Sequence, residues 1–299
     1  TAFEDAVGTR FENDFGGAVS GAARDGFALR DRSDILLGQV TVGPNPFDPT
    51  LPANADAELD LAAAAVVAGA TDGDVRQEAG TSLVAPNLVV STMTAGAGGA
   101  NVTLANAGND FDTVATEGGA FNDEANDLDD DVRGGLVLLD DDTDGGGLVL
   151  RNVKAEELVL LARGAVTQEG GSSLEGLAGG AVDAEVTAID GGGTARAVTL
   201  DQGANDFARL SVVGDAVRVR DENVLTLQNS RAATSLEVTT AGDLTLVDVA
   251  AVALGEVGLG GFGSNGVLRA EVGGGTVFAD GVFANLMQVT NGASVTLSN

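Results

Sequence analysis

The sequence contains no cysteine, histidine, tryptophan or tyrosine among its 299 residues. Without Cys and His it has no thiolate or imidazole nucleophile, no Ser–His–Asp triad, no zinc site of the usual kind and no disulfide framework. Without Trp and Tyr it also lacks the usual aromatic platforms of sugar-binding sites. Carboxylates, arginines, hydroxyls and the single Lys154 remain for catalysis, and this composition favours a protein that is not an enzyme.

Positive charge is also scarce, because 15 basic residues stand against 45 acidic ones and give a net charge of −30. Phosphate backbones and anionic lipid surfaces repel such a chain, so we expect no nucleic-acid partner and no membrane insertion. The longest apolar run, residues 61–70, is about half the length that spans a bilayer. An acid-rich, lysine-poor surface suits a halophilic protein in high salt, and a soluble extracellular surface is the simpler explanation.

An internal repeat organises the chain. The tripeptide Asn-Asp-Phe occurs at 13–15, 109–111 and 205–207, so that both intervals are 96 residues. Val-Thr-Leu recurs near the same period, and "VRQEAGTSL" from Val75 resembles "VTQEGGSSL" from Val166 with an offset of 91. The spacing predicts about three copies of a 96-residue unit in one continuous domain, 1–299. An acidic loop insertion at about 122–147 interrupts the middle copy.

Short alternating runs such as "NVTLAN", "AVTLDQ" and "LEVTTAGDLTLVDV" predict β-strands, and Gly, Asn and Asp punctuate them as turns. The window 153–163 fits a helix or a strand equally well. The composition favours an all-β parallel β-helix (β-solenoid), since it has small aliphatic side chains, 44 glycines and only 5 prolines. In such a fold, similar side chains of successive coils lie above one another in a narrow core. A β-sandwich array is the alternative, because 96 residues is also a sandwich length.

The Asn-Asp-Phe motif itself has a structural interpretation. Asn and Asp favour turns because their side chains cap nearby backbone groups. Phe15, Phe111 and Phe207 would then fill the core at one corner of the solenoid. A ligand-binding role for the motif is the alternative.

Longer stretches resemble a known family. "VTLANAGNDFDTVAT", "VTLDQGANDFARLSVVGDAVRVRDENVLTLQ" and "AVTQEGGSSL" are similar to repeats of filamentous-haemagglutinin-like exoproteins, large bacterial adhesins exported by two-partner secretion or related routes. The resemblance covers most of the chain and is weakest over 45–69 and the acidic insertion. It implies a right-handed parallel β-helix at the surface of a Gram-negative bacterium. It also implies a structural or adhesive role, with a ligand on a host or neighbouring cell as partner.

Two motifs suggest ligand sites. "DDDTDG" places Asp140, Asp142 and Asp144 at alternate positions, as in the opening of a calcium loop, but Arg151 stands where a full loop has glutamate. These aspartates are a weak Ca²⁺ candidate, and a solvated acidic loop is the simpler interpretation; no cofactor is required. "GLGGFG" at 258–263 fits the dinucleotide fingerprint on paper, but strand-like, glycine-rich sequence follows it, so a turn between coils is favoured.

The expected function is that of a non-enzymatic extracellular structural protein, a segment or subunit of a surface fibre or adhesin. The final strand, "GASVTLSN", reads as a regular repeat strand rather than a cap, which predicts that the solenoid continues end to end, through further repeats or a second copy. The expected contact residues are Val295, Thr296 and Leu297 at one end and Phe3, Phe11 and Phe15 at the other.

Two alternatives remain. One is a β-helix enzyme that degrades polysaccharide with Asp and Arg, for which a groove holding two carboxylates and an arginine is the discriminating feature. The other is an adhesion module stabilised by calcium.

Overall fold

The computed structural model of the chain divides into two units, which are described separately. Unit 1 comprises 1–145 and 151–156, and unit 2 comprises 146–150 and 157–299. The structure describes residues 16–23, 26–31, 34–42, 65–70, 73–92, 100–116, 132–141, 145–251, 267–273, 276–280, 282–284, 286–291 and 294–298.

The strands of unit 1 stack in parallel along three ladders. One ladder joins β3, β5, β7 and β9, the second joins β1, β3, β6 and β8, and the third joins β2, β4, β6 and β8. The strands are β1 Val19–Ala23, β2 Gly26–Asp31, β3 Ile35–Val42, β4 Ala65–Ala70, β5 Val75–Gln77, β6 Leu83–Thr92, β7 Val102–Leu104, β8 Asp110–Ala115 and β9 Val132–Asp140.

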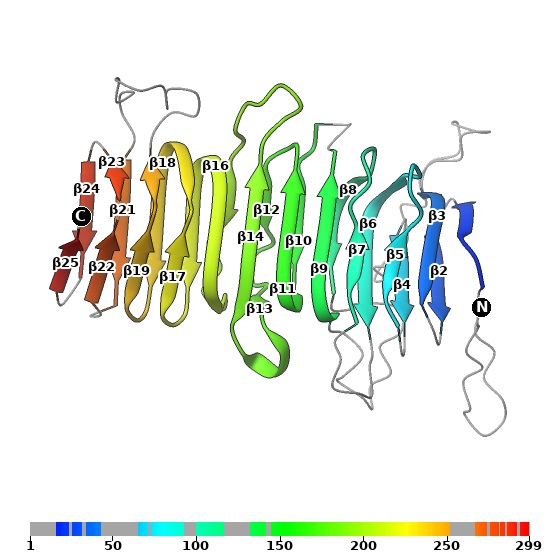
Figure 1. The fold of residues 1–299 in the computed structure, drawn as a ribbon, viewed down its shortest axis with the longest axis horizontal. Coiled ribbons are helices and arrows are strands. Elements are labelled where there is room, and N and C mark those ends of the chain that lie inside the picture. Colours follow the sequence, from blue (N-terminus) through cyan, green and yellow to red (C-terminus); the bar gives the residue numbers. More distant parts are fainter. Residues whose placement is uncertain are drawn as a thin grey trace. The chain divides into compact units, whose positions relative to one another are not determined.

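Unit 2 has the same construction (Figure 1). Its ladders join β10, β12, β15, β16, β18, β21 and β24; then β14, β16, β17, β19, β22 and β25; then β14, β16, β18, β20 and β23. β10 Leu148–Arg151 and β11 Val153–Ala162 are divided between the units. The others are β12 Val166–Gln168, β13 Leu174–Glu175, β14 Val182–Ala188, β15 Val198–Leu200, β16 Phe207–Asp221, β17 Leu225–Gln228, β18 Arg231–Thr240, β19 Leu244–Val247, β20 Ala250–Ala251, β21 Val267–Val272, β22 Thr276–Asp280, β23 Phe283–Ala284, β24 Leu286–Thr290 and β25 Ser294–Ser298.

This arrangement confirms the predicted all-β solenoid class. In the described part of the chain the one helical segment is the 3₁₀ turn Leu177–Gly179, and the ambiguous window 153–163 is strand β11. No helix in that part is long and apolar enough to cross a membrane. The number of repeat copies and the single continuous domain stay predictions, as does the right-handed coil.

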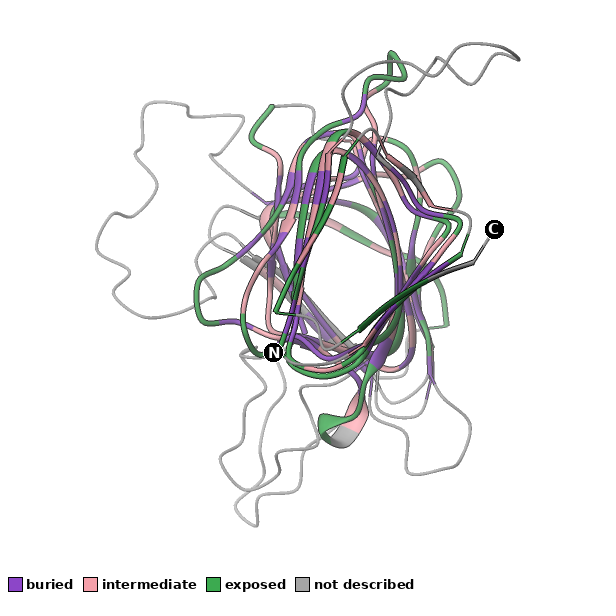
Figure 2. Cartoon of the chain, turned by 90° about the vertical axis from the view of Figure 1, so that its left-hand side faces the viewer, coloured by how far each residue is buried: buried purple, intermediate pink, exposed green. Residues whose placement is uncertain are grey.

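The core of each unit lies inside its coils, because the strands alternate buried and exposed side chains (Figure 2). In unit 2, Val166, Val198 and Val217 pair in register on successive coils, and each is at most 1% exposed. Burying a side chain of this size stabilises the folded state by about 1.5–3 kcal/mol. The narrow interior explains why small aliphatic residues dominate the sequence.

Part of the segment expected as an acidic loop is a strand. Residues 132–140 form β9, in which every second side chain is buried. "VRGGLVLLD" has the period-two alternation of a solenoid strand, which the acidic residues before it had obscured. Residues 117–131 lie outside the described residues.

Asparagine and aspartate adopt left-handed backbone at corners of unit 2. Asn229 follows β17 with φ +49°, and Asp248 follows β19 with φ +52°. The Asn229 N–H donates to the Val247 carbonyl at 3.0 Å, so that one corner hydrogen-bonds to the next coil. Asn and Asp tolerate this conformation better than other residues with a Cβ, which explains their place at these turns.

We expect Asn229→Val to lower the free energy of unfolding by about 1–2 kcal/mol, because a β-branched side chain clashes with the left-handed backbone. Asn229→Gly should stay within about 0.5 kcal/mol of the wild type, since glycine adopts this conformation freely. Urea unfolding followed by circular dichroism measures both changes. Thr226→Val, on the neighbouring extended strand, is the control, and equal losses for the two valine variants would contradict this account.

Candidate functional site

Two copies of the Asn-Asp-Phe motif lie in the described residues, at the starts of β8 and β16. The rings of Phe111 and Phe207 are 2% and 0% exposed, which confirms the predicted core-filling role for these two. Asn109 and Asn205 are also fully buried. The copy at 13–15 lies outside the described residues.

In unit 1, the buried Asn109 forms a reciprocal amide pair with Gln77 on β5. Gln77 Nε2 donates to Asn109 Oδ1 at 2.7 Å, and Asn109 Nδ2 donates to Gln77 Oε1 at 3.0 Å. The same Asn109 side chain accepts from the Leu83 N–H at 2.9 Å and donates to the Leu104 carbonyl at 3.1 Å. Both polar atoms of the Asn109 side chain are therefore satisfied inside the core.

Unit 2 repeats this network. Gln168 Nε2 donates to Asn205 Oδ1 at 2.7 Å, and Asn205 Nδ2 donates to Gln168 Oε1 at 2.9 Å. Asn205 also accepts from the Leu174 N–H at 3.0 Å and donates to the Leu200 and Arg220 carbonyls, each at 3.2 Å. The two landmarks of the repeat, Gln-Glu and Asn-Asp-Phe, thus meet in space, which their separate recurrence in the sequence did not reveal.

The chain between the paired amides differs in length. Gln77 and Asn109 are 32 residues apart, whereas Gln168 and Asn205 are 37 apart. In unit 2 the intervening chain includes the 3₁₀ turn Leu177–Gly179 and a turn closed by the Ile189–Ala195 bridge. The pair geometry is the same, so connecting segments absorb the length difference.

A buried aspartate completes the corner. In unit 1 it comes from the end of β9, and in unit 2 it comes from the far end of β16, the strand that Phe207 begins. The Phe111 N–H donates to Asp140 Oδ1 at 3.0 Å, and the Phe207 N–H donates to Asp221 Oδ2 at 2.7 Å. The sequence separations are 29 and 14 residues, and the longer one contains residues 122–140 of the predicted acidic insertion. The corner therefore contains Gln, Asn-Asp-Phe and Asp from three segments of one unit.

Asp221 is a buried carboxyl, 2% exposed, at the end of β16. Burial raises its pKa above the ordinary value, while the N–H groups of Phe207 and Asn223 oppose the increase and the negative charges of Asp206 and Glu222 add to it. A carboxyl with a raised pKa in the folded state stabilises the fold most when it is protonated.

Of the three aspartates predicted to bind calcium, the structure describes only Asp140. Asp140 is fully buried at the end of β9 and accepts the Phe111 N–H. Asp142 and Asp144 lie outside the described residues, and the described part of the chain holds no group of three or more acidic side chains placed to bind a metal ion. The calcium site stays a prediction.

The predicted end-contact residues are described only in part. Val295, Thr296 and Leu297 lie on β25, which pairs with β22, and Val295 is 47% exposed. Phe3, Phe11 and Phe15 lie outside the described residues, as does the glycine motif at 258–263.

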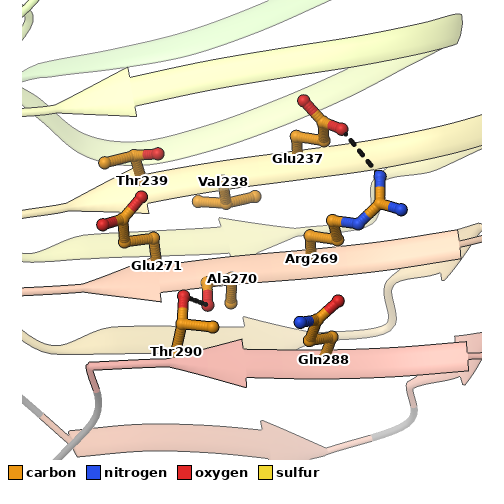
Figure 3. Close-up of a pocket in the computed structure, with 8 residues that line it drawn as sticks. All are labelled: Glu237, Val238, Thr239, Arg269, Ala270, Glu271, Gln288 and Thr290. Atoms are coloured by element: carbon orange, nitrogen blue, oxygen red, sulfur yellow. Dashed lines mark hydrogen bonds and ion pairs between the residues drawn. The ribbon is translucent and has the colours of Figure 1, made fainter.

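An outer groove in unit 2 was not anticipated from the sequence. It has a volume of about 260 Å³ and lies across β18, β21 and β24 (Figure 3). Register pairing forms one row, Glu237–Arg269–Gln288, and a second row, Thr239–Glu271–Thr290. These residues do not recur at the repeat period, so no periodic signal marked them.

The groove holds two carboxylates and an arginine, which is the combination expected of the polysaccharide-degrading enzyme named as an alternative. Arg269 Nη1 donates to Glu237 Oε1 at 3.0 Å, and Arg218 Nε donates to Glu237 Oε2 at 3.3 Å. Both carboxyl oxygens of Glu237 therefore accept hydrogen bonds from guanidinium groups. Glu271 Oε1 accepts from Asn291 Nδ2 at 3.0 Å.

Comparison with known proteins locates one repeat. Residues 134–213 match a family described as repeats of unknown function (DUF5649). The match contains Gln168 and Asn205, and hence one complete amide pair. No curated protein and no solved structure matches the chain. The similarity supports a repeat protein and covers less than a third of the chain.

We expect Gln168→Leu to lower the free energy of unfolding by about 1–3 kcal/mol, because it leaves buried amide atoms of Asn205 without their partner. The double variant Gln168→Leu/Asn205→Leu should be destabilised by about 0.5–3 kcal/mol less than the sum of the single changes. Urea unfolding measures this cycle. Thr167→Val, on the solvent side of the same strand, is the control, and strict additivity would show that the amides are not coupled.

The raised pKa of Asp221 predicts a pH dependence. Its contribution to stability is fully present below the unfolded-state pKa, where the carboxyl is protonated, and is lost as pH rises through the folded-state pKa. The free energy of unfolding of Asp221→Asn should therefore compare best with that of the wild type at pH 7. As the pH falls towards about 4, the wild type should become more stable relative to the variant. Thermal unfolding from pH 4 to 8 measures the difference. Asp280→Asn, at an exposed position, is the surface control, and a pH-independent difference between Asp221→Asn and the wild type would exclude the mechanism.

Proposed function

We propose that this chain is a non-enzymatic structural segment of an extracellular fibre or adhesin of the filamentous-haemagglutinin-like kind. Three features support the proposal: parallel ladders that stack coil on coil, a corner network that recurs in both units, and a match of residues 134–213 to a repeat family. Repeats of this type add length without a new fold, because each coil contacts mainly its neighbours. A long scaffold is what a surface fibre requires.

The observation that carries the proposal is an open apolar ladder in unit 2. Val295 pairs in register with Val277, which is fully buried, yet Val295 itself is 47% exposed. Side chains in register on parallel strands share a face, so Val295 belongs to the inner column. We infer that a further coil, from the same chain or a second copy, covers it.

We propose that the chain lies at the cell surface of a Gram-negative bacterium, as the resemblance to filamentous-haemagglutinin-like exoproteins implies. A net charge of −30 supports a saline habitat, because salt screens the repulsion between acidic groups. The partners would be further repeats of this chain and a ligand on a host or neighbouring cell. No cofactor is required, and weak Ca²⁺ binding by Asp140, Asp142 and Asp144 would make the chain a calcium-stabilised module.

A polysaccharide-degrading enzyme is the second candidate, favoured by the groove with Glu237, Arg269 and Glu271. A glycosidase needs one protonated carboxyl as general acid. The two arginines that hydrogen-bond Glu237 work against this role, so the structural function is preferred.

We expect the purified chain to form filaments that electron microscopy and sedimentation detect at high concentration. Val295→Arg should abolish them, because it places a charge in an apolar column. Thr296→Arg is the matched control, since Thr296 lies next to it on β25 and pairs with the outward-facing, 46% exposed Phe278. Monodisperse chains near 30 kDa at all concentrations, unchanged in both variants, would refute the fibre.

A further inference from the structure

We propose that the groove across β18, β21 and β24 binds a short stretch of neutral polysaccharide and does not cleave it. Its volume of about 260 Å³ lies just below the roughly 300–1,000 Å³ of sites for drug-sized molecules, and this suits one or two sugar rings of a chain that continues outside. The proposal rests on the adhesive role proposed above and supplies the ligand class of that role.

Hydroxyl-rich ligands need mixed donors and acceptors, and the groove provides both. Within the described part of the chain, the Gln288 amide and the Thr239 hydroxyl form no hydrogen bond, so both are available to a ligand. Arg269 uses Nη1 on Glu237, and Glu271 uses Oε1 on Asn291, so each presents its other polar atoms. Figure 3 shows these side chains on the same side of their strands.

The geometry of the groove suits an extended chain. Its two rows run from strand to strand, from Glu237 to Gln288 and from Thr239 to Thr290. Neighbouring strands lie about 4.8 Å apart, which is comparable to the length of one sugar ring. Successive rings would therefore meet equivalent polar positions on successive strands.

The charges of the groove favour an uncharged ligand. Glu237 is compensated by Arg218 and Arg269, whereas Glu271 is held by the neutral amide of Asn291. A sulfated or carboxylated polysaccharide would meet Glu271 and a chain of net charge −30, so repulsion would oppose it. The described residues hold no cluster of three or more acidic side chains placed to bind a metal ion.

Binding without cleavage follows from the contacts of Glu237. Its side chain is 35% exposed, and both of its carboxyl oxygens already accept hydrogen bonds from arginines, Oε1 from Arg269 and Oε2 from Arg218. A general acid must present a carboxyl group to the glycosidic oxygen, and neither oxygen of Glu237 is free to do so.

The test is affinity electrophoresis of the full chain in native gels that contain hydroxyethyl cellulose, glucomannan, xyloglucan or dextran, with alginate and dextran sulfate as anionic probes. We expect at least one neutral polymer to retard the chain. Gln288→Ala/Glu271→Ala should raise the dissociation constant about tenfold, since two hydrogen bonds are lost. Glu185→Ala, an exposed glutamate on β14, should change it by less than about twofold.

Three results would overturn the proposal. They are no retardation by any neutral polymer, binding by Gln288→Ala/Glu271→Ala equal to that of the wild type, and retardation by the anionic polymers alone. Release of new reducing ends by the wild type, lost in Glu237→Gln, would also overturn it in favour of the enzyme. Circular dichroism checks that the variants fold. If filaments form but no polymer binds, only the proposed ligand site in the groove is refuted. If a polymer binds but no filaments form, only the proposed fibre is refuted.

Discussion

The buried Gln–Asn amide pair is the interaction on which the stacking of the coils depends. Columns of Val, Leu and Ala hold the coils together, but these side chains are nearly interchangeable and would tolerate a shift of one coil against the next. A pair such as Gln168 and Asn205 is different, because breaking it leaves buried donors and acceptors without partners. The amide pair therefore selects one register where apolar burial alone would allow several, as polar core residues do in coiled coils.

The rest of the corner follows from this pair. Once Asn109 or Asn205 is held, the next two residues begin a strand whose phenylalanine enters the core and whose N–H reaches Asp140 or Asp221. The carboxylate is buried at a cost, which for Asp221 appears as a raised pKa. Hydrogen bonds link strands that meet at the corner, so segments between them can lengthen without disturbing the core.

The outward faces carry none of these constraints, and there the two units are free to differ. Asp201, Arg218, Glu237 and Arg269 form a line of ion pairs on the outside of unit 2, at 3.7, 3.3 and 3.0 Å. Exposed pairs of this kind contribute little to stability, about 0–1 kcal/mol each, and they balance charge locally on an acidic surface. This line of ion pairs leads into the groove, so the repeating core supports an outer surface that does not repeat.

The sequence by itself determined the class of fold and the identity of the buried phenylalanines. Val-Thr-Leu alternation predicts strands, and three Asn-Asp-Phe motifs at 96-residue intervals predict a repeat whose Phe111 and Phe207 are buried. Tertiary structure alone decided which segments meet. Gln–Asn pairs span 32 or 37 residues and Phe–Asp contacts span 29 or 14, so no fixed spacing could reveal them. The sequence did not predict the groove either, because hydrogen-bond partners and surface hollows depend on which coils stack. Burial of a single side chain, by contrast, depends mainly on the alternation of its own strand.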